Sequence, residues 1–494
     1  MIAEAEIKLT YDELLHQNIQ LRHELDQLKR IVFGQKNERF VPTFPEEQLS
    51  MGLEVASIAV VSPVLETISY TRRKELSSPA KLHQGRMALP ASLPREIVII
   101  EPTEDVSGLK KIGEEITEQL EATPMKLYVR RTIRPKYVKA TGEGILIGSL
   151  PSMPIDKCIA GPGLLASIVI GKFIDHLPLY RQIEIFKRSG ITLSSSTVGD
   201  WIEGCCKLLT PLYEVHRREV LGASYLQVDE SPIKVLDKDK KGSTHRGYHW
   251  VYHSPQDQLV LFDYREGRGR EGPEELLKEF KGYLQSDGYE VYNSFDKREG
   301  VTHLHCMAHA RRKFDEALPN DKARAEYVLS EMQKLYGVER KIREEGLNAP
   351  EAKAVRQEES LPVLRGLNAW LLENYQQVLP QSPIGKAISY SLQRWEKLCV
   401  YAGDGRLQID NNLVENAIRP LAIGRKNYLF AGSHEGARRA AMLYSFMASC
   451  KKHDINPQHW LKDILESIAD WPQKRIQELL PHHWKKNTSA QRQN

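Results

Sequence analysis

The chain is poor in cysteine. Its 494 residues include only six, at irregular spacing: Cys158, Cys205, Cys206, Cys306, Cys399 and Cys450. Cysteines so few and so scattered do not supply a disulfide framework, so we expect a reducing, cytoplasmic setting. The first ten residues lack the basic and apolar regions of a signal peptide. The apolar run at 164–170 is far shorter than a membrane span, and no membrane association is expected.

The chain also lacks a strong net charge. Its formal charge is only +4, which excludes a protein that binds nucleic acid as a uniform polycation. Any contacts with nucleic acid must therefore come from local basic patches. Hydrophobic residues make up 41% of the chain and charged residues 27%, as in soluble globular proteins, and 494 residues suggest several domains.

Residues 1–40 contain a short heptad pattern. Two series of residues recur at intervals of seven: Leu14, Leu21 and Leu28, and four residues after each of them Asn18, Leu25 and Val32. The pattern predicts a coiled coil through which the chain self-associates, with Asn18 fixing the register. The alternative is an amphipathic helix packed on its own domain.

The next segments differ in composition. Residues 41–95 are rich in Pro, Ser and short charged clusters and are interpreted as a linker. Residues 96–155 have the alternating pattern of a small strand-rich module. Residues 156–221 are predicted to be helical, with one helix opened by Pro162 and a second at 179–188.

A third helix in this region is predicted after Ser194–Ser196, which can cap it. Two helices joined by a short turn with a glycine fit a DNA-binding helix-turn-helix, whose strong basic cluster would be Lys187 and Arg188. A plain helical bundle fits the same pattern.

An α/β pattern occupies residues 222–315. Five strands are predicted: Tyr225–Leu236, Gly247–His253, Gln258–Tyr264, Gly282–Asp287 and Val301–Cys306. Pro273 is expected to open a short helix at 274–280, and Met307–Ala317 is expected to be helical. Three antiparallel strands followed by helix-linked strands allow the first and fourth to lie side by side.

Residues 316–400 are highly charged, helical in pattern and without strand signals, and are interpreted as an insertion into the α/β region. A second part of that region follows at 401–450. It contains a helix predicted to begin near Asn411 and to end at about Ile423. Residues 451–494 are expected to form a helical tail.

Three acids in this arrangement are candidates for phosphodiester chemistry. Asp229 and Asp287 lie at or near strand ends, and Glu415 lies on the helix after Asn411, in one polar stripe with Asn412, Asn416 and Arg419. Cleavage and joining of DNA need an activated hydroxyl and a stabilised leaving oxygen, which two divalent cations can provide. Mg²⁺ prefers hard oxygen ligands, so carboxylates from separate elements must converge.

Structural roles explain the same residues. Asp229 can cap a turn with Ser231 and Pro232, Asp287 can open an Asp-Gly turn, and Glu415 can pair with Arg419. Spacing alone favours these structural roles.

The sequence segments around the three acids favour catalytic over structural roles. Five of them carry a resemblance: FGQKNER (33–39), VDESPIKV (228–235), GYLQSDGY (282–289), CMAHARRKF (306–314) and DNNLVENAIRP (410–420). In this order, and over nearly the whole chain, the sequence resembles the large transposase of bacterial insertion-sequence family sixty-six.

The resemblance implies an Asp-Asp-Glu transposase with a ribonuclease H-like core. The three catalytic and metal-binding acids would be Asp229, Asp287 and Glu415, with two Mg²⁺ or Mn²⁺ ions. The substrates would be the element's terminal repeats and target DNA. Two small accessory proteins of the same element, and a place near the bacterial nucleoid, are also implied.

Further residues receive a role near such a centre. Basic side chains near the centre are expected to contact DNA phosphates rather than to form solvated faces: Arg311, Arg312, Lys313, Arg419, Arg425 and Lys426. Lys187 and Arg188, in the predicted helix-turn-helix, are also expected to contact phosphates. Cys306 and His309 are expected to support the active site. Trp370 and Trp395 either stack on an unpaired base or, as we favour, pack in a core.

Zinc is not expected. The resembled family usually carries a cysteine zinc knuckle, but residues 100–138 contain no cysteine. The Cys-x-x-His pattern of Cys306 and His309 is half of a zinc site, without a convincing second half. Two other functions stay open. One is a DNA-binding remnant that no longer cuts, which the lost knuckle favours and the presence of all three acids opposes. The other is a nuclease or resolvase with the same fold and a different DNA substrate.

Overall fold

The computed structural model describes residues 127, 129, 136–138, 145–147, 152–156, 158–236 and 242–484. The predicted coiled coil and linker lie outside these residues, as does most of the predicted strand-rich module. The chain divides into two units, Met1–Arg130 and Arg131–Asn494, and the second is described here. It begins with a small antiparallel pair, β1 (Lys136–Val138) and β2 (Ile145–Ile147).

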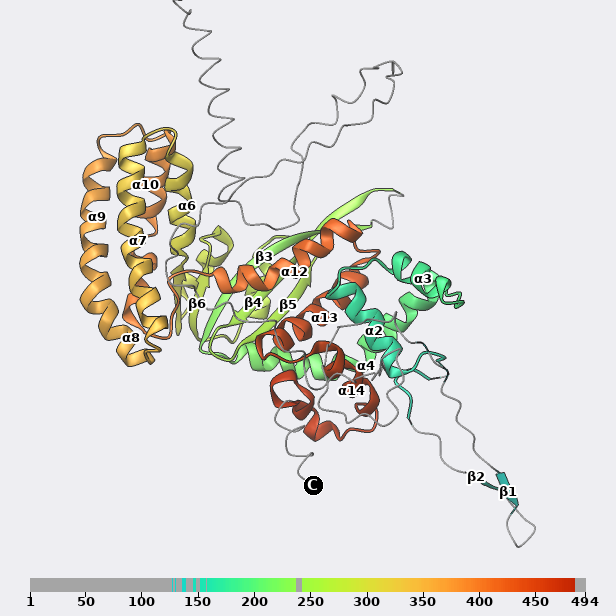
Figure 1. Ribbon diagram of the computed structural model, residues 1–494. Coiled ribbons are helices and arrows are strands. Elements are labelled where there is room, and N and C mark those ends of the chain that lie inside the picture. The colour runs from blue at the N-terminus through green and yellow to red at the C-terminus, as the bar shows by residue number, and fades with distance from the viewer. Residues whose placement is uncertain are drawn as a thin grey trace, which may run out of the picture. The chain divides into compact units, whose positions relative to one another are not determined.

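A five-stranded mixed sheet forms the centre of this unit (Figure 1). Its strands are β3 (Tyr225–Leu236), β4 (Thr244–Ser254), β5 (Leu259–Arg265), β6 (Gly282–Ser286) and β7 (Val301–His305). The spatial order is β5-β4-β3-β6-β7. The first three strands are antiparallel, and β6 and β7 run parallel to β3. The prediction that the first and fourth strands lie side by side is confirmed.

Strand β3 has apolar side chains on one face. Leu226 and Val228 belong to a buried cluster with Leu284 of β6. Helix α5 (Glu271–Leu276) and the 3₁₀ helix η2 (Glu290–Lys297) supply side chains to the same cluster. The helix predicted at 274–280 spans Glu271–Leu276 instead, and Pro273 lies within its first turn, where a proline is tolerated.

The open edge of the sheet, β5, is covered by helices. The hydroxyls of Ser445 and Ser449, on α13 (His434–Lys452), accept hydrogen bonds from the backbone N–H groups of Phe262 and Val260, at 2.8 and 3.1 Å. On the same strand, Tyr213 donates to the carbonyl of Phe262 at 2.7 Å. These contacts use polar groups that an exposed edge strand would offer to another chain.

Tyr213 belongs to α4 (Ser195–Leu221), which packs on this edge beside α2 (Pro162–Phe173), α3 (Leu179–Arg188) and α14 (Pro457–Ser467). The predicted helices of this region are present, and the Ser194 hydroxyl caps α4 by accepting from the Thr197 N–H at 3.0 Å. The C-terminal half of α4 packs on the sheet. None of the described helices is long and apolar enough to cross a membrane.

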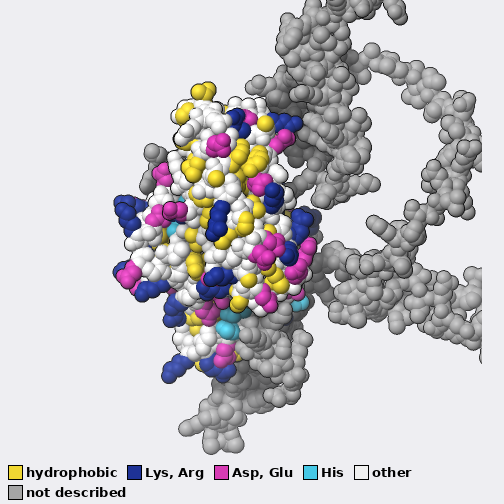
Figure 2. All heavy atoms as spheres, turned by 90° about the vertical axis from the view of Figure 1, so that its left-hand side faces the viewer, with side chains coloured by type: hydrophobic (Ala, Val, Ile, Leu, Met, Phe, Trp, Pro, Cys, Tyr) yellow, Lys and Arg dark blue, Asp and Glu magenta, His cyan; other side chains and the backbone are white. Residues whose placement is uncertain are grey.

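A separate group of helices stands beside β7. It consists of α6 (Met307–Ala317), α7 (Lys322–Glu344), α8 (Ala349–Val355), α9 (Leu361–Tyr375), α10 (Pro383–Gln393) and α11 (Trp395–Cys399). Trp370 and Trp395 pack against its apolar core, as we favoured from the sequence. Basic and acidic side chains are interspersed over the face that Figure 2 shows.

One buried arginine joins this helical bundle to the segment that returns to the sheet. Arg356 is 2% exposed and lies in a single π-helical turn, Arg356–Ser360. Its guanidinium forms two hydrogen bonds with Glu339, at 2.8 and 2.6 Å. It also donates to the carbonyls of Tyr401, Asp404 and Leu407 at 3.0–3.1 Å. The bundle thereby holds residues 401–407 in place.

Replacing Arg356 by Ala should therefore destabilise the bundle strongly. The change leaves the Glu339 carboxylate and three carbonyls without their partner, and loss of one member of a buried pair costs about 3–5 kcal/mol. The free energy of unfolding, measured with urea, checks this. Arg365→Ala, at an exposed position of α9, is the matched control and should change stability by no more than about 0.5 kcal/mol. Equal decreases in the free energy of unfolding for the two variants would contradict the stabilising role of Arg356.

Candidate active site

The parallel register of β3 and β6 places the two aspartates next to each other. Gln227 lies opposite Gln285 in this register. Asp229 and Asp287 each follow two residues later in the chain, and alternate residues of a strand share a face. Asp229 therefore shares a face of the sheet with Gln227, and Asp287 is the first residue after β6. The charge of Asp287 acts on the Asp229 carboxyl, so the two acids lie close to each other.

Asp287 begins a tight turn. Its Oδ1 accepts a hydrogen bond from the Tyr289 N–H at 2.8 Å, and Gly288 adopts a φ of +92°. This conformation favours glycine. A Cβ on Gly288 would also lie 2.9 Å from Nε of Arg394. The Asp-Gly turn that the sequence suggested is present, and it leaves the other oxygen of Asp287 for further contacts.

Glu415 lies in the first turn of α12 (Asn412–Tyr428), which runs along β3 (Figure 1). The far end of this helix is fixed to the strand. Arg425 donates a hydrogen bond to the carbonyl of Pro232. Beyond the helix, the N–H of Ala431 donates to the carbonyl of Lys234 at 2.8 Å. The helix ends at Tyr428, five residues later than predicted, because these contacts extend its packing along β3.

The near end of α12 is fixed by a buried polar network. Nε2 of Gln227 donates to the carbonyl of Asp410 at 2.9 Å, and Nε2 of Gln285 donates to the carbonyl of Gln408 at 3.0 Å. Nε2 of Gln227 also donates to Oε1 of Gln285 at 2.9 Å, and the Tyr225 hydroxyl donates to the same oxygen at 2.5 Å. These three side chains are at most 1% exposed. The strands that bear the aspartates therefore also hold the loop that leads to Glu415.

Cys306 supports the same loop from the adjacent strand end. Its sulfur accepts a hydrogen bond from the Asn411 N–H at 3.4 Å, and its own N–H donates to the carbonyl of Ser286 at 3.0 Å. Burial raises the pKa of the Cys306 thiol to about 12, so it is a neutral thiol at physiological pH. The contacts give Cys306 a positioning role.

His309 faces the third acid. Its Nε2 lies 3.9 Å from Oε1 of Glu415. Burial lowers the pKa of His309, and the charges of Asp287 and Glu415 oppose that shift. The imidazole therefore lies within electrostatic reach of two of the three acids.

The electrostatics of the acids indicate a site for cations. Burial raises the pKa of Asp229 to about 8, and the neighbouring charges of Glu230, Asp287 and Glu415 add to the effect. Oε1 of Glu415 is buried without a hydrogen-bond partner among the described residues. Carboxylate oxygens that destabilise one another in this way fit hard divalent cations. The ligand oxygens of the three acids do not all lie within 4.8 Å of one another, so binding a shared ion requires them to move closer.

The structural roles considered for the acids have different outcomes. The proposed turn at Asp229 is wrong, because β3 continues through Ser231 and Pro232 to Leu236. Glu415 faces His309 rather than forming an ion pair with Arg419 among the described contacts. Asn411 is the N-cap residue of α12, and Oδ1 of the neighbouring Asp410 accepts a hydrogen bond from the Asn412 N–H at 3.1 Å.

The predicted DNA contacts fall into three groups. Arg311, Arg312 and Lys313 follow His309 on α6, and the charges of Arg312 and Lys313 reach its imidazole. Arg419 and Lys426 lie on α12, where Arg419 is exposed, whereas Arg425 is engaged by β3. Lys187 and Arg188 are exposed at the end of α3, which packs on α2 and α4.

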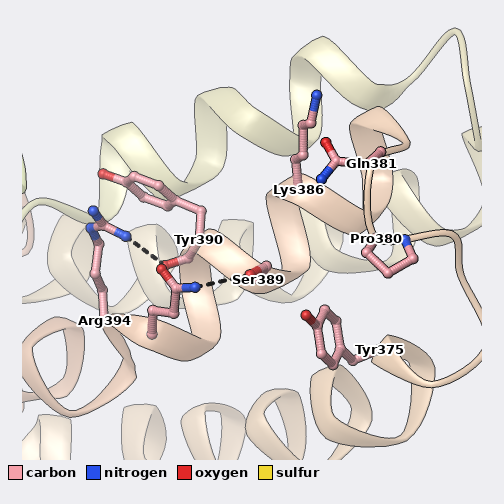
Figure 3. Close-up of a pocket in the computed structure, with 8 residues that line it drawn as sticks. Tyr375, Pro380, Gln381, Lys386, Ser389, Tyr390 and Arg394 are labelled. Atoms are coloured by element: carbon pink, nitrogen blue, oxygen red, sulfur yellow. Dashed lines mark hydrogen bonds between the residues drawn. The ribbon is translucent and has the colours of Figure 1, made fainter.

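A pocket in the helical bundle is linked to Asp287 by one of its lining side chains. Its volume is about 430 Å³, and it is lined by Tyr375, Pro380, Gln381, Lys386, Ser389, Tyr390, Gln393 and Arg394 (Figure 3). The hydroxyl of Tyr390 donates to the carbonyl of Asp287 at 2.8 Å. Lys386 and Arg394 contribute positive charge and no acid lines the pocket, so its chemistry suits an anion.

Sequence reasoning missed Gln227, Gln285, Tyr390 and Arg394. The alternation along Tyr225–Asp229 and Tyr283–Asp287 was a usable signal, because a glutamine on the same face as each aspartate occurs at the same distance before it. The partners of these glutamines lie 123 and 183 residues away along the chain, and no local pattern points to them.

Comparison with known proteins identifies the class of the chain as a transposase. Residues 157–439 match the family model described as "Transposase IS66 family", and residues 445–482 match the "IS66 C-terminal element". The chain belongs to the IS66 transposase family. Residues 20–98, assigned above to the coiled coil and linker, match a model described as "Transposase C of IS166 homeodomain".

Several relatives come from Sinorhizobium fredii (strain NBRC 101917 / NGR234). The protein described as "Uncharacterized protein y4hP" is 32% identical over 96% of this chain and 90% of its own length. "Uncharacterized protein y4jD" is 32% identical over 97% of both chains. No solved structure matches the chain significantly.

The raised pKa of Asp229 leads to a pH-dependent stability. An acid whose pKa is higher in the folded than in the unfolded protein lowers the free energy of unfolding at a pH where it ionises. For Asp229 this decrease grows as the pH rises from 3.8 to about 8, by about 1.4 kcal/mol per pH unit. Asp229→Asn should therefore raise the melting temperature in chelator, and more at pH 8 than at pH 5.

Asp315→Asn, an exposed acid on α6, is the control and should shift the melting temperature little at either pH. Thermal unfolding followed by circular dichroism measures both variants. An Asp229→Asn effect that is the same at pH 5 and pH 8 would show that the acid is not held in a pKa-raising site.

Proposed function

We propose that the protein is an Asp-Asp-Glu transposase that cleaves the ends of its insertion sequence and joins them to target DNA. The α/β core would be ribonuclease H-like, interrupted by the helical bundle. The observation that carries this proposal is the convergence of Asp229, Asp287 and Glu415. They come from two parallel strands and from a helix that hydrogen bonds attach to these strands. The family supports a transposase role, and the site supports metal-dependent chemistry at these residues.

The donor set fits Mg²⁺ or Mn²⁺. Asp229, Asp287 and Glu415 would hold two such ions, which supply a deprotonated hydroxyl nucleophile and stabilise charge on the phosphate and leaving oxygens. The acids offer only hard oxygen ligands, whereas zinc favours nitrogen and sulfur. Glu230 is less suited to the role, because Arg268 already pairs with its carboxylate at 2.5 Å.

The remaining residues of the site hold the proposed catalytic acids in position. Cys306, Gln227 and Gln285 fix the loop before Glu415, and His309 orients its carboxylate. Basic residues on α6 lie where a phosphate backbone could approach the acids, and the pocket beside Tyr390 would hold a further anionic segment of the DNA. Self-association through residues 1–40 and two accessory proteins complete the proposed assembly.

Removing any of the three acids should abolish the reaction. Asp229→Asn, Asp287→Asn and Glu415→Gln keep shape and hydrogen-bonding capacity but bind hard cations much more weakly. Purified protein incubated with labelled element ends and Mg²⁺ should lose both nicked and joined products in each variant. Because the three act together, double variants should be little worse than single ones.

Asp410→Asn is the matched control for these variants. Asp410 is a neighbouring acid whose backbone carbonyl, rather than its carboxylate, holds Gln227, so the amide should keep substantial activity. Cleavage by Glu415→Gln together with no cleavage by Asp410→Asn would mean that the third ligand is misassigned. Wild-type protein that binds element ends without cutting them would favour the inactive remnant.

The basic residues on α6 should contact phosphates without reading sequence. Arg312→Ala and Lys313→Ala should each weaken binding to any DNA. Each should also reduce the slope of log K against log salt by about 0.9, the value for one phosphate left without its cation. Fluorescence anisotropy over a salt series measures this. A changed sequence preference with an unchanged slope would assign that residue to base recognition instead.

A further inference from the structure

Two segments far apart in the chain meet at a group of metal-binding side chains away from the three acids. Glu219 lies near the end of α4, and His482 and His483 lie in the last described turn of the chain. Nε2 of His482 is 2.9 Å from Oε2 of Glu219, and Nε2 of His483 is 3.8 Å from Oε1. One ligand atom from each of the three residues lies within 4.8 Å of the other two, a property unique to this group among the described residues.

Glu219 is the oxygen donor of this group. Its side chain is 30% exposed and that of His482 is 17% exposed, so both are partly shielded from solvent. Carboxylate oxygen beside imidazole nitrogen is a donor set that divalent transition metals accept.

A buried histidine, His216, lies one turn earlier on α4. His216 is 0% exposed, and burial lowers its pKa to about 4. Its Nε2 donates to the carbonyl of Val260 at 2.8 Å, so Nδ1 carries the lone pair. That atom is buried and has no hydrogen-bond partner among the described residues. The side of the site formed by α4 therefore adds no competing positive charge from His216.

The histidine turn is held in position by contacts that do not involve Glu219. Leu480 is fully buried, and the indole of Trp460, on α14, donates to the carbonyl of Leu479 at 3.0 Å. The indole of Trp484 donates to Asp463 of the same helix at 2.6 Å. The ligands are thus brought together by the fold itself, which lowers the ordering cost of binding an ion.

We propose that Glu219, His482 and His483 form a binding site for a divalent transition metal, best represented by Zn²⁺. Two imidazoles and one carboxylate suit zinc and exclude Mg²⁺ as a strong competitor. Three protein ligands leave a fourth position for water. The ion ties the C-terminal segment to α4, the helix that covers the edge strand β5.

This site is separate from the catalytic acids and from the missing cysteine knuckle. Zinc was not expected from the sequence, because residues 100–138 contain no cysteine and the pattern of Cys306 and His309 has no second half. The ligands found here are 263 residues apart, from Glu219 to His482, and local spacing does not connect them. The proposal therefore stands whether or not the protein cleaves DNA.

Equilibrium dialysis of untagged, full-length, chelator-stripped protein against Zn²⁺ tests the proposal. We expect one zinc per chain that excess Mg²⁺ does not displace, and a melting temperature that rises with zinc. Glu219→Gln, His482→Gln and His483→Gln should each weaken zinc binding by about tenfold or more and remove the rise in melting temperature. His459→Gln, an exposed histidine on α14, is the matched control and should bind zinc as the wild type does.

Co²⁺ identifies the ligands independently. Cobalt bound to this site should give d–d absorption without the thiolate charge-transfer band that cysteine ligands produce. His483→Gln guards against misfolding, because His483 is 39% exposed and its circular dichroism without metal should match the wild type. The proposal is overturned by wild-type protein that binds no zinc, by full zinc affinity in the folded His483→Gln variant, or by a cobalt–thiolate band.

Discussion

Hydrogen bonds from two buried glutamines to one loop determine the geometry of the proposed active site. Gln227 and Gln285 lie side by side on parallel strands, and each donates to a backbone carbonyl of residues 408–410. Buried amides need partners, and these carbonyls satisfy them. The strands that lead to Asp229 and Asp287 therefore hold the loop from which the helix with Glu415 begins.

The rest of the fold keeps this loop from moving. Arg356 holds residues 401–407 from the side of the helical bundle, and Cys306 accepts from Asn411 on the side of α6. Arg425 fixes the far end of α12 to β3. The interruption of the α/β core by the helices of residues 322–399 thus has a structural consequence, because the bundle is one of the supports of the third acid.

Local patterns predicted much of this fold. The limits of β3 and α3 were predicted to the residue, since alternation and capping signals are local. The length of α12 was underestimated, because its last turn depends on contacts with Pro232 and Lys234. The three acids were named through a resemblance, whereas the glutamines and the Glu219–His482–His483 group depend on partners more than a hundred residues away. Such contacts leave no periodic signal in the sequence.

Attachment of residues 408–410 to Gln227 and Gln285 is proposed to complete a metal site of three acids. A crystal structure of the full-length protein with element-end DNA and Mn²⁺, with anomalous diffraction recorded for manganese, tests it most directly. We expect manganese peaks contacted by Asp229, Asp287 and Glu415, with the hydrogen bonds from Gln227 and Gln285 to residues 408–410 intact. Manganese bound by Asp229 and Glu230, with Glu415 turned away from the ions, would contradict it.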